Sequence, residues 1–316
     1  MKAFALTSAG TPAALSELPD PELSADGTLV RVVAASVNGF DVYQASGGLI
    51  AMMPHDLPTV IGRDFAGVVV AVGPGRKDVV VGDEVLGFVP STPPLRSGTW
   101  AELVAGGANL ILARKPSGLA WDAAAAIPLA ASTALDAVDA VVPGPGDDIL
   151  IMGATGGVGS FAVQFAAQRG ARLIATAKPG DDALMRSLGA SETIDYTQSG
   201  LGDSVRKLAP GGLAGLIDTV SRGKAFEALA ALLPEGARAS TTLGAADVPA
   251  LAERGIRATN VAGKPTPARL AVFSDWATSG RLQIPIQGTF PLADAQSAID
   301  AFNAGTRGKL VLTIGD

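Results

Sequence analysis

The chain of 316 residues is 48% hydrophobic and 17% charged, which predicts a compact globular protein long enough for two domains. Its net charge of -6 and sequence pI of about 4.9 argue against a nucleic-acid or anionic-membrane partner, because both need clustered lysine and arginine. Cysteine is absent and histidine occurs once, at His55, so thiolate metal sites, disulfides and cysteine nucleophiles are excluded, and a histidine-dependent triad is disfavoured.

The N-terminal residues predict a cytoplasmic protein. Residues 1–8 lack the apolar core of about 7–15 residues that marks a signal peptide. The sequence also contains no run of the roughly 18 apolar residues that a membrane span needs. We therefore expect neither a secretory signal nor a membrane partner.

The first 120 residues predict a β-rich domain. Short runs rich in valine, alanine and phenylalanine are separated by turns that contain glycine, proline and aspartate. Strands are predicted at 2–7, 28–36, 64–72 and 84–89. Short strands separated by such turns favour a small barrel or sandwich.

From Trp121 the sequence predicts an alternation of helices and strands. An alanine-rich helix is expected over 122–142, interrupted at Pro128. Helices then alternate with strands predicted at 149–152, 173–177, 192–195, 216–219, 237–242 and 257–261. Six strands in this arrangement are the number in a complete doubly wound dinucleotide-binding domain.

The residue pattern of the last segment again resembles that of the first domain. A helix is predicted at 267–279, followed by elements at 284–290, 292–304 and 309–314. Both chain ends then build one domain, 1–121 with 267–316, and residues 122–266 form an inserted nucleotide-binding domain. The predicted fold class is α/β, a β-rich domain with an inserted Rossmann doubly wound parallel sheet.

The central motif is a glycine-rich turn at 153–159, between a predicted strand and a helix expected at 160–168. In this order the helix N-terminus offers amide donors to a pyrophosphate. Read as G-x-G-x-x-G, the motif has Ala154 at the first glycine, while Gly156 lets the backbone approach phosphates and Gly159 lets the helix lie close to the strand. The alternative is a turn that serves only tight packing. The candidate pyrophosphate site comprises Ala154, Thr155, Gly156, Gly157, Val158 and Gly159.

The end of the second strand of this domain favours NADP(H) over NAD(H). An NAD-selective protein usually has an acid there, which accepts from the ribose 2′-hydroxyl and repels a 2′-phosphate. Here the position is Ala177, followed by Lys178, whose ammonium suits a phosphate. Asp181 and Asp182 are expected to be the N-cap and a first-turn acid of the next helix. The alternative for Lys178 is an ordinary solvated loop lysine.

Blocks of residues along nearly the whole chain stand in the order and spacing of one known family. They are residues 37–43 (VNGFDVY), 58–67 (PTVIGRDFAG), 82–87 (GDEVLG), 98–102 (GTWAE), the central stretch 146–164, 188–190 with 194–196, and 308–312 (GKLVL). Together they resemble the zinc-independent quinone oxidoreductases, the zeta-crystallin-like branch of the medium-chain dehydrogenase/reductase superfamily. The resemblance implies a GroES-like catalytic domain built from both chain ends, with the Rossmann domain inserted.

The resemblance also implies that no metal is bound. In the superfamily's zinc alcohol dehydrogenases, the catalytic metal needs a cysteine near the position of Asn38, a histidine at that of Arg63 and a cysteine ahead of the nucleotide domain. This chain has no cysteine, and a guanidinium does not ligate zinc. The loop between Val89 and Thr99 is too short for the four-cysteine structural lobe. His55, in a proline-flanked loop, is expected to be a surface or cleft-rim residue.

The site residues follow from the same resemblance. Tyr43 matches a tyrosine thought to protonate or orient the substrate in related enoyl reductases, and Asn38 and Asp41 are implied to line the same cleft. The alternative is that Tyr43 only packs as a cleft wall. The implied NADPH-binding residues are the turn residues given above together with Thr133, Thr176, Lys178, Tyr196, Leu243 and Gly244.

Without a metal, hydride transfer needs an acceptor that is already electrophilic. Quinones and α,β-unsaturated carbonyls meet this condition, because conjugation spreads the arriving negative charge. The predicted function is NADPH-dependent, metal-independent reduction of a quinone or an enone, and the resemblance implies a homodimer. The rival hypothesis is a catalytically idle NADPH-binding protein with a structural or sensory role.

Overall fold

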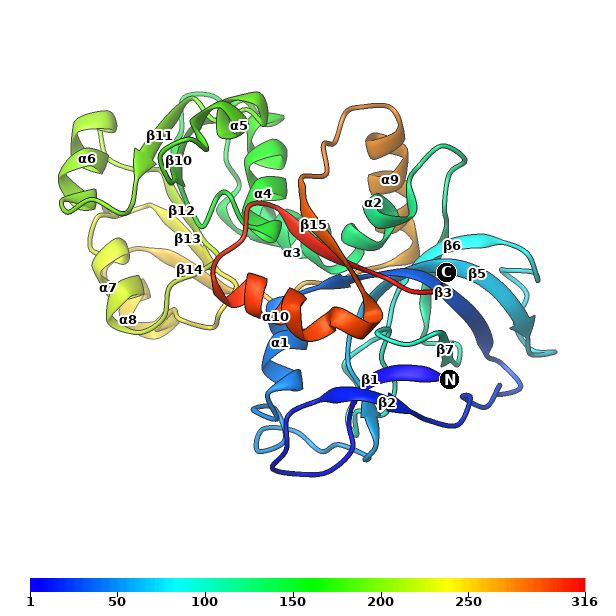
Figure 1. The fold of residues 1–316 in the computed structure, drawn as a ribbon. Coiled ribbons are helices and arrows are strands. Elements are labelled where there is room, and N and C mark those ends of the chain that lie inside the picture. The colour runs from blue at the N-terminus through cyan, green and yellow to red at the C-terminus, as the bar shows by residue number, and fades with distance from the viewer. Residues whose placement is uncertain (316) are drawn as a thin grey trace. The chain divides into compact units, whose positions relative to one another are not determined.

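The computed structural model describes residues 1–315, which divide into two compact units (Figure 1). Unit 1 comprises Met1–Leu129 and the segment that begins at Pro265, and unit 2 is Ala130–Lys264. Unit 1 is rich in strands, whereas unit 2 contains a parallel sheet whose strands alternate with helices. The predicted α/β fold class is therefore confirmed, with a β-rich part made from both chain ends and an inserted doubly wound sheet.

The strands of unit 1 form two sheets. Their bounds are β1 Lys2–Leu6, β2 Ala14–Glu17, β3 Thr28–Val37, β4 Thr59–Val60, β5 Asp64–Val72, β6 Glu84–Phe88, β7 Leu103–Gly106, β8 Ile111–Arg114, β15 Ile286–Pro291 and β16 Lys309–Thr313. One sheet has the order β2-β1-β4, and the other runs β15-β16-β3-β5-β6-β8, with β7 paired to β3. Because β16 pairs antiparallel with β3, the C-terminal strand completes a sheet that the N-terminal segment begins.

The helices of unit 1 are α1 Gly39–Ala45, α2 Trp121–Ala126, α9 Pro267–Thr278, the 3-10 turn η1 Leu292–Asp294, and α10 Ala295–Asn303. Alternate residues of each strand face the same side, so Val30 of β3 and Phe65 of β5 lie in one apolar core. Trp100 is fully buried there. Its ring packs on Phe4 with 5.8 Å between centroids, and its indole N–H donates to the Ser36 carbonyl oxygen at 3.1 Å. The indole thus fills the core without leaving its N–H unpaired.

Unit 2 contains a six-stranded sheet that is parallel throughout. Its strands are β9 Asp148–Met152, β10 Arg172–Ala177, β11 Glu192–Asp195, β12 Gly215–Asp218, β13 Arg238–Thr241 and β14 Arg257–Asn260, in the order β11-β10-β9-β12-β13-β14. From β9 the chain adds β10 and β11 towards one edge of the sheet. It then returns to β9 and adds β12, β13 and β14 towards the opposite edge. Beyond the carboxyl end of β9 lies the switch point at which doubly wound folds bind ligands.

The helices of unit 2 are α4 Gly157–Ala167, α5 Asp182–Ser187, α6 Leu201–Leu208, α7 Lys224–Ala230 and α8 Val248–Glu253. On one face of the sheet, Leu150 and Leu216 share an apolar core with Phe226 of α7 and Leu251 of α8. Ile151, which faces the opposite side of β9, is also fully buried. Burial on both faces explains why β9 reads as a continuous apolar run in the sequence.

The break expected at Pro128 separates two helices. α2 ends at Ala126, and α3 (Pro128–Val141) begins at the proline, whose missing N–H is tolerated in a first turn. The sequence-based domain boundary at residue 122 lies inside α2. This helix packs against β3 and β5, so the structure places it with unit 1, and the chain enters unit 2 after Leu129.

Most predicted strands agree with the structure to within one or two residues. The helix after the glycine turn begins at Gly157, three residues before the predicted start, because the turn continues directly into helical backbone. The sequence prediction missed the short strands β2, β4, β7 and β8, which have four residues or fewer and no strong alternation.

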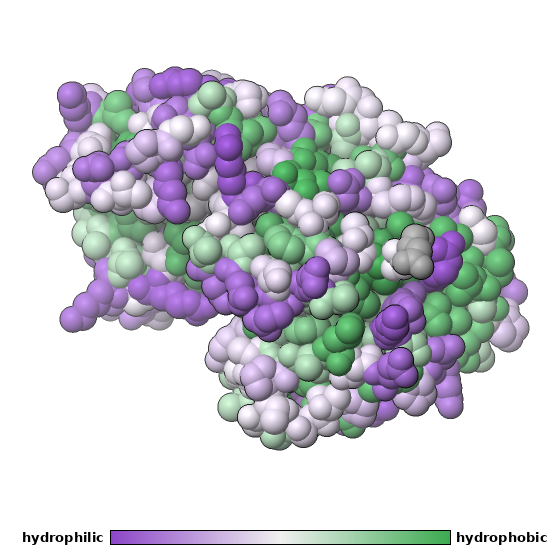
Figure 2. All heavy atoms as spheres, viewed as in Figure 1, coloured by the Kyte–Doolittle hydropathy of each residue, from purple (hydrophilic) through white to green (hydrophobic). Residues whose placement is uncertain are grey.

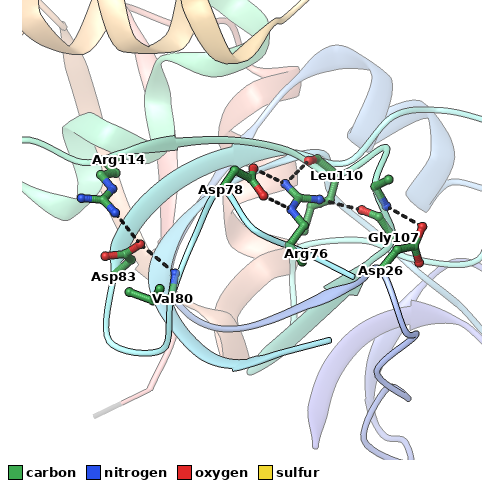
Figure 3. A network of polar contacts seen from close by, with 9 residues as sticks. Asp26, Arg76, Asp78, Val80, Asp83, Gly107, Leu110 and Arg114 are labelled. Atoms are coloured by element: carbon green, nitrogen blue, oxygen red, sulfur yellow. Dashed lines mark hydrogen bonds and ion pairs between the residues drawn. The ribbon is translucent and has the colours of Figure 1, made fainter. Parts of the chain in front are cut away.

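Long loops of unit 1 are joined by a polar network around Arg76 (Figure 3). The Arg76 guanidinium pairs with Asp78 and donates to the carbonyl oxygens of Gly107 at 3.0 Å and Leu110 at 3.2 Å. The Arg76 side chain is only 8% exposed, and its two bonds to carbonyl oxygens are partly buried. One buried guanidinium therefore ties the β5–β6 connection to the β7–β8 connection.

The surface view shows hydrophobic residues gathered over β5 and β6 (Figure 2). The exposed apolar side chains in this region are Val70, Val80 and Val81. The turn that carries Val80 is fixed by Asp83, which accepts from the Val80 amide at 3.0 Å and from Arg114 at 3.3 Å (Figure 3). Across residues 1–315, no helix is both long and apolar enough to cross a membrane.

Val142 has a strained backbone that predicts a stabilising substitution. It follows α3 with φ +51°, a region that a β-branched residue rarely adopts, and its side chain is exposed. Val142→Gly should raise the free energy of unfolding by about 1 kcal/mol, because glycine removes the steric strain at a smaller entropic cost. Urea unfolding measures the change, with Val142→Ala as a control that retains a Cβ. A less stable glycine variant would contradict the strain argument.

Candidate functional site

The glycine turn of unit 2 lies between β9 and α4. Gly153 has φ +71°, which glycine adopts without strain. A Cβ on Gly159 would overlap the Gly153 carbonyl oxygen, so the first turn of α4 can approach the strand only because residue 159 has no side chain. The Gly153 amide donates to Thr176 Oγ1 at 3.1 Å, and that hydroxyl donates to the Ile151 carbonyl oxygen at 3.2 Å. A side chain of β10 therefore helps to hold the turn.

The start of α4 fits an anionic group. Gly156 is the N-cap residue, and no side chain caps the helix within the described part of the chain. The first amides of a helix lack partners within the helix and sit at its positive dipole end. Gly156, Gly157 and Val158 are each partly accessible, whereas Ala154 and Thr155 are buried. The turn can therefore accept the pyrophosphate of a dinucleotide, and the chemistry of the site agrees with this cofactor class.

The remaining cofactor candidates flank the carboxyl ends of neighbouring strands. Ala177 ends β10 and is buried, and the exposed Lys178 follows it. Tyr196 follows β11 and is 41% exposed. Leu243 and Gly244 follow β13. Strand order thus brings these three loops to the same edge of the sheet as the glycine turn.

Thr133 is the one cofactor candidate that lies on α3, where it is 8% exposed. A Cβ on Gly263 would overlap Thr133 Oγ1, so the segment after β14 lies directly against this hydroxyl. Near Lys178, Asp181 occupies the N-cap position of α5, and Asp182 in the first turn accepts from Thr193 Oγ1 at 2.6 Å. Asp182 is thus engaged by β11, and the strand end carries alanine where an NAD-selective protein has an acid.

Unit 1 contains a buried charge cluster, which we define as Asn38, Asp41, Arg63, Asp64 and Lys309. All five side chains are at most 8% exposed. They come from the end of β3, from α1, from the start of β5 and from β16. Two carboxylates face two cations, so the cluster is electrically neutral when every group is ionised.

Asn38 lies at the centre of this cluster. Its Oδ1 accepts from Lys309 Nζ at 2.6 Å, and its Nδ2 donates to Asp41 Oδ2 and Asp64 Oδ2, each at 3.0 Å. Lys309 Nζ also donates to the Val37 carbonyl oxygen at 3.0 Å. Both polar atoms of the Asn38 side chain are therefore occupied by the protein, which suits a residue that positions α1.

Arg63 extends the cluster towards α1. It donates to Gln44 Oε1 at 3.1 Å, and its guanidinium lies 5.5 Å from the centre of the Phe40 ring. Burial raises the pKa of Asp41 to about 7, the nearby Arg63 opposes this rise, and Asp64 adds to it. Burial also raises the pKa of Asp64, against the attraction of Lys309.

Burial lowers the pKa of Lys309, and this fall is opposed by Asp64 and Asp41. Lys309 belongs to the family block 308–312, but the sequence predicted no role for it. The signal that could have revealed it is a lysine that opens an apolar strand. A lysine at such a position is buried only when it has partners.

The cluster does not fit a metal ion. Arg63 stands where zinc relatives carry a histidine, and neither a guanidinium nor an ammonium is a ligand. The two carboxyl groups already lie near two cations, Arg63 and Lys309, which oppose the rise of their pKa values. Within residues 1–315, no group of three or more histidine, aspartate or glutamate side chains is arranged to hold a metal.

Tyr43 is separate from the buried cluster, although it lies on α1 with Asp41. Its side chain is 49% exposed. A Cβ on Gly48 would overlap the Tyr43 ring, so glycine makes room for the phenol to lie across the next turn. The predicted catalytic set therefore divides into a buried pair, Asn38 and Asp41, and an accessible phenol. His55, partly buried, bonds through Nδ1 to the Met53 carbonyl oxygen at 2.9 Å.

Asp41 should make the stability of the chain depend on pH. Its pKa is about 7 in the folded chain against an ordinary value of 3.8. Because the pKa is raised in the folded chain, Asp41 makes a stabilising contribution to the free energy of unfolding. This contribution is complete below about pH 4 and is lost as the pH rises to about 7. Asp41→Asn resembles the protonated carboxyl, so its unfolding free energy should rise relative to the unmutated chain by roughly 2 kcal/mol between pH 5 and pH 8.

Urea unfolding at several pH values measures this difference. Asp275→Asn, which alters an exposed carboxylate on α9, is the matched control and should show a constant difference. A constant difference for Asp41→Asn as well would show that Asp41 ionises normally.

Comparison with known proteins supports the resemblance seen in the sequence blocks. A family model described as an alcohol dehydrogenase GroES-like domain matches residues 24–116. A second, described as a zinc-binding dehydrogenase, matches residues 188–312. The solved structure of a quinone oxidoreductase from Coxiella burnetii superposes with a TM-score of 0.88 at 27% identity, covering 100% of this chain and 99% of that one.

Two curated plant relatives are similar over part of the chain. The 2-methylene-furan-3-one reductase of Solanum lycopersicum is 37% identical over 211 residues, which are 64% of this chain and 54% of that protein. The chloroplastic NADPH-dependent alkenal/one oxidoreductase of Arabidopsis thaliana is 38% identical over 193 residues, which are 60% and 50% of the two chains. The chain thus spans about half the length of these relatives. The fold and these matches together show that the chain belongs to the medium-chain dehydrogenase/reductase superfamily, in its zeta-crystallin-like quinone oxidoreductase family.

Proposed function

We propose that this chain is an NADPH-dependent oxidoreductase that transfers a hydride to a quinone or an α,β-unsaturated carbonyl compound without a metal. The observation that carries the proposal is the buried charge cluster, which includes Arg63 at the position that the resemblance matches to a zinc-ligating histidine. Two cations, Arg63 and Lys309, lie near Asp41 and Asp64 there in place of a set of metal ligands, so the proposed site offers a substrate carbonyl no Lewis acid at this position. The substrate must then be electrophilic in itself, as conjugated carbonyls are.

The names of the compared proteins support the same chemistry. They are a quinone oxidoreductase, a furanone reductase and an alkenal/one oxidoreductase, and the last is named as NADPH-dependent. All three names describe enzymes that act on conjugated carbonyl compounds. The proposed substrate class of this chain is therefore a quinone or an enone.

The proposed cofactor site is the carboxyl edge of the sheet in unit 2. Backbone amides at the start of α4 would hold the pyrophosphate, and Lys178 would pair with the 2′-phosphate. Tyr196, Leu243, Gly244 and Thr133 complete the proposed set. When bound there, NADPH supplies the hydride. The sequence-based assignment of residues 122–266 to this cofactor domain stays a prediction.

The proposed role of Tyr43 is to donate a hydrogen bond or a proton to the substrate carbonyl oxygen. Its phenol is accessible, whereas Asn38 and Asp41 are buried and hold the start of α1. A donor at this oxygen stabilises the negative charge that develops there. The cytoplasmic location and the homodimer stay predictions, and the Arabidopsis relative is named as chloroplastic.

The direct test is a substrate panel that follows NADPH oxidation with quinones, enones and simple ketones in the presence of a chelator. Turnover of conjugated substrates alone is the expected result. Turnover that disappears on chelation and returns with zinc would contradict the metal-free proposal. NADPH binding without turnover of any acceptor would favour the catalytically idle alternative.

Cofactor preference provides a prediction about Lys178. NADPH should bind more tightly than NADH, because Ala177 removes the carboxylate that would repel a 2′-phosphate. Lys178→Ala should weaken NADPH binding roughly three- to tenfold and leave NADH binding unchanged. Fluorescence titration measures both, and Lys207→Ala, which removes an exposed lysine of α6, is the matched control. Equal affinity of the unmutated chain for the two cofactors would contradict the assignment.

A second prediction separates the two substrate classes. Tyr43→Phe should lower kcat for enones by about 10²–10⁴-fold if the phenol supplies the proton, while NADPH affinity is unchanged. Quinone reduction should fall less, because the aromatic ring stabilises the hydroquinone anion, which can take its proton from water. The chain has two tyrosines, so Tyr196→Phe is the matched control and should not change the ratio of enone to quinone turnover. An unchanged kcat for both substrates would leave Tyr43 as a packing residue.

A further inference from the structure

The glycine turn is held from both neighbouring strands. Thr176 of β10 binds the Gly153 amide, as described above. On the other side, Thr219 follows β12, and its hydroxyl donates to the Met152 carbonyl oxygen at 2.9 Å and lies 3.4 Å from the Gly153 carbonyl oxygen. A Cβ on Gly153 would overlap Thr219 Oγ1 and Val220 Cγ1. The segment after β12 therefore rests directly against the turn.

Asp218 fixes that segment. It is the last residue of β12 and is fully buried. Its Oδ1 accepts from the amides of Val220 at 2.9 Å and Ser221 at 3.0 Å, which is the local turn that aspartate side chains favour. Its Oδ2 has no hydrogen-bond partner among residues 1–315. A buried carboxylate with one unpaired oxygen is unfavourable for folding. We therefore attribute the role of Asp218 to the backbone geometry that its Oδ1 imposes.

This geometry connects the carboxylate to the turn in two steps. The two amide bonds set the direction of the chain after β12. That direction places the Thr219 hydroxyl on the carbonyl oxygens of Met152 and Gly153, and the Val220 side chain beside Gly153. Without the carboxylate, both amides need new acceptors in a buried site and the segment has no fixed direction. The turn would then keep only its support from β10.

We propose that Asp218 is a positioning residue for the dinucleotide, acting through Thr219 and Val220 to hold the glycine turn in its binding shape. This inference rests on the proposed function, because it concerns the same NADPH site. Asp218 is fully buried, so it would act on the cofactor only through the glycine turn, whose backbone amides are proposed to bind the pyrophosphate.

The test is NADPH binding, measured by fluorescence titration and by the rise in thermal midpoint that NADPH causes. Asp218→Ala should raise the Kd for NADPH about tenfold, the loss expected when two buried hydrogen bonds are broken. Asp218→Asn should stay within about threefold of the unmutated chain, because its side-chain oxygen still accepts from both amides. Thr219→Val keeps the shape but removes the hydroxyl, and should raise Kd about threefold.

The matched control is Asp147→Ala. Asp147 accepts from the Gly144 amide at 2.9 Å in a similar turn, but that turn precedes β9 at the amino edge of the same sheet. Its loss should lower the thermal midpoint of the free chain and leave the Kd unchanged. The comparison separates a general loss of stability from a loss of cofactor positioning.

Two results would overturn the inference. One is normal NADPH affinity in Asp218→Ala together with a lower thermal midpoint, which would make Asp218 purely structural. The other is normal affinity in Thr219→Val, which decides the matter if Asp218→Ala does not fold. A failure of the unmutated chain to bind NADPH at all would instead reject the proposed function, and the inference with it.

Discussion

The hydrogen bond from Lys309 to Asn38 joins the last strand of the chain to the end of β3 across 271 residues. It lies inside unit 1, where neither group can find a partner in water. The Asn38 Nδ2 in turn donates hydrogen bonds to Asp41 and Asp64. Removing one cation from such a cluster leaves an uncompensated buried charge, which typically costs about 3–5 kcal/mol. The order of α1, and with it the placement of Tyr43, depends on this connection.

The two units use different physical means to prepare a site. Unit 1 uses buried charges of opposite sign, so each of its two buried carboxylates lies in the field of a cation. Unit 2 uses backbone amides, and its side chains act mainly by shaping the turn from β10 and β12. The contrast explains why the glycine turn occupies one short stretch of the sequence, while the cluster is assembled from three distant segments, 38–41, 63–64 and 309.

The elements that the sequence predicted best are those with a local cause. Buried parallel strands read as apolar runs, and the close approach at Gly159 requires a residue without a Cβ. Lys309 and Asp218 were not predicted as supports, because their partners lie far along the chain or on backbone amides that carry no residue signature. The division between buried Asp41 and accessible Tyr43 also escaped prediction, since both stand on one short helix that packs against α10, an element far along the chain. The predicted boundary at residue 122 differs from the division into units for a similar reason, because only the packing of α2 on β3 and β5 places it in unit 1.

The discontinuity of unit 1 has a consequence for the order of folding during synthesis. Unit 2 is one continuous segment, so it can fold as soon as it has left the ribosome. Unit 1 cannot close until β16 has followed, because β3 lacks its neighbour and Asp41 and Asp64 have only Arg63 as a cation until Lys309 arrives. The nascent first 129 residues therefore carry an open sheet edge and unbalanced carboxylates while the inserted unit is being made. In this chain the part that begins first is completed last.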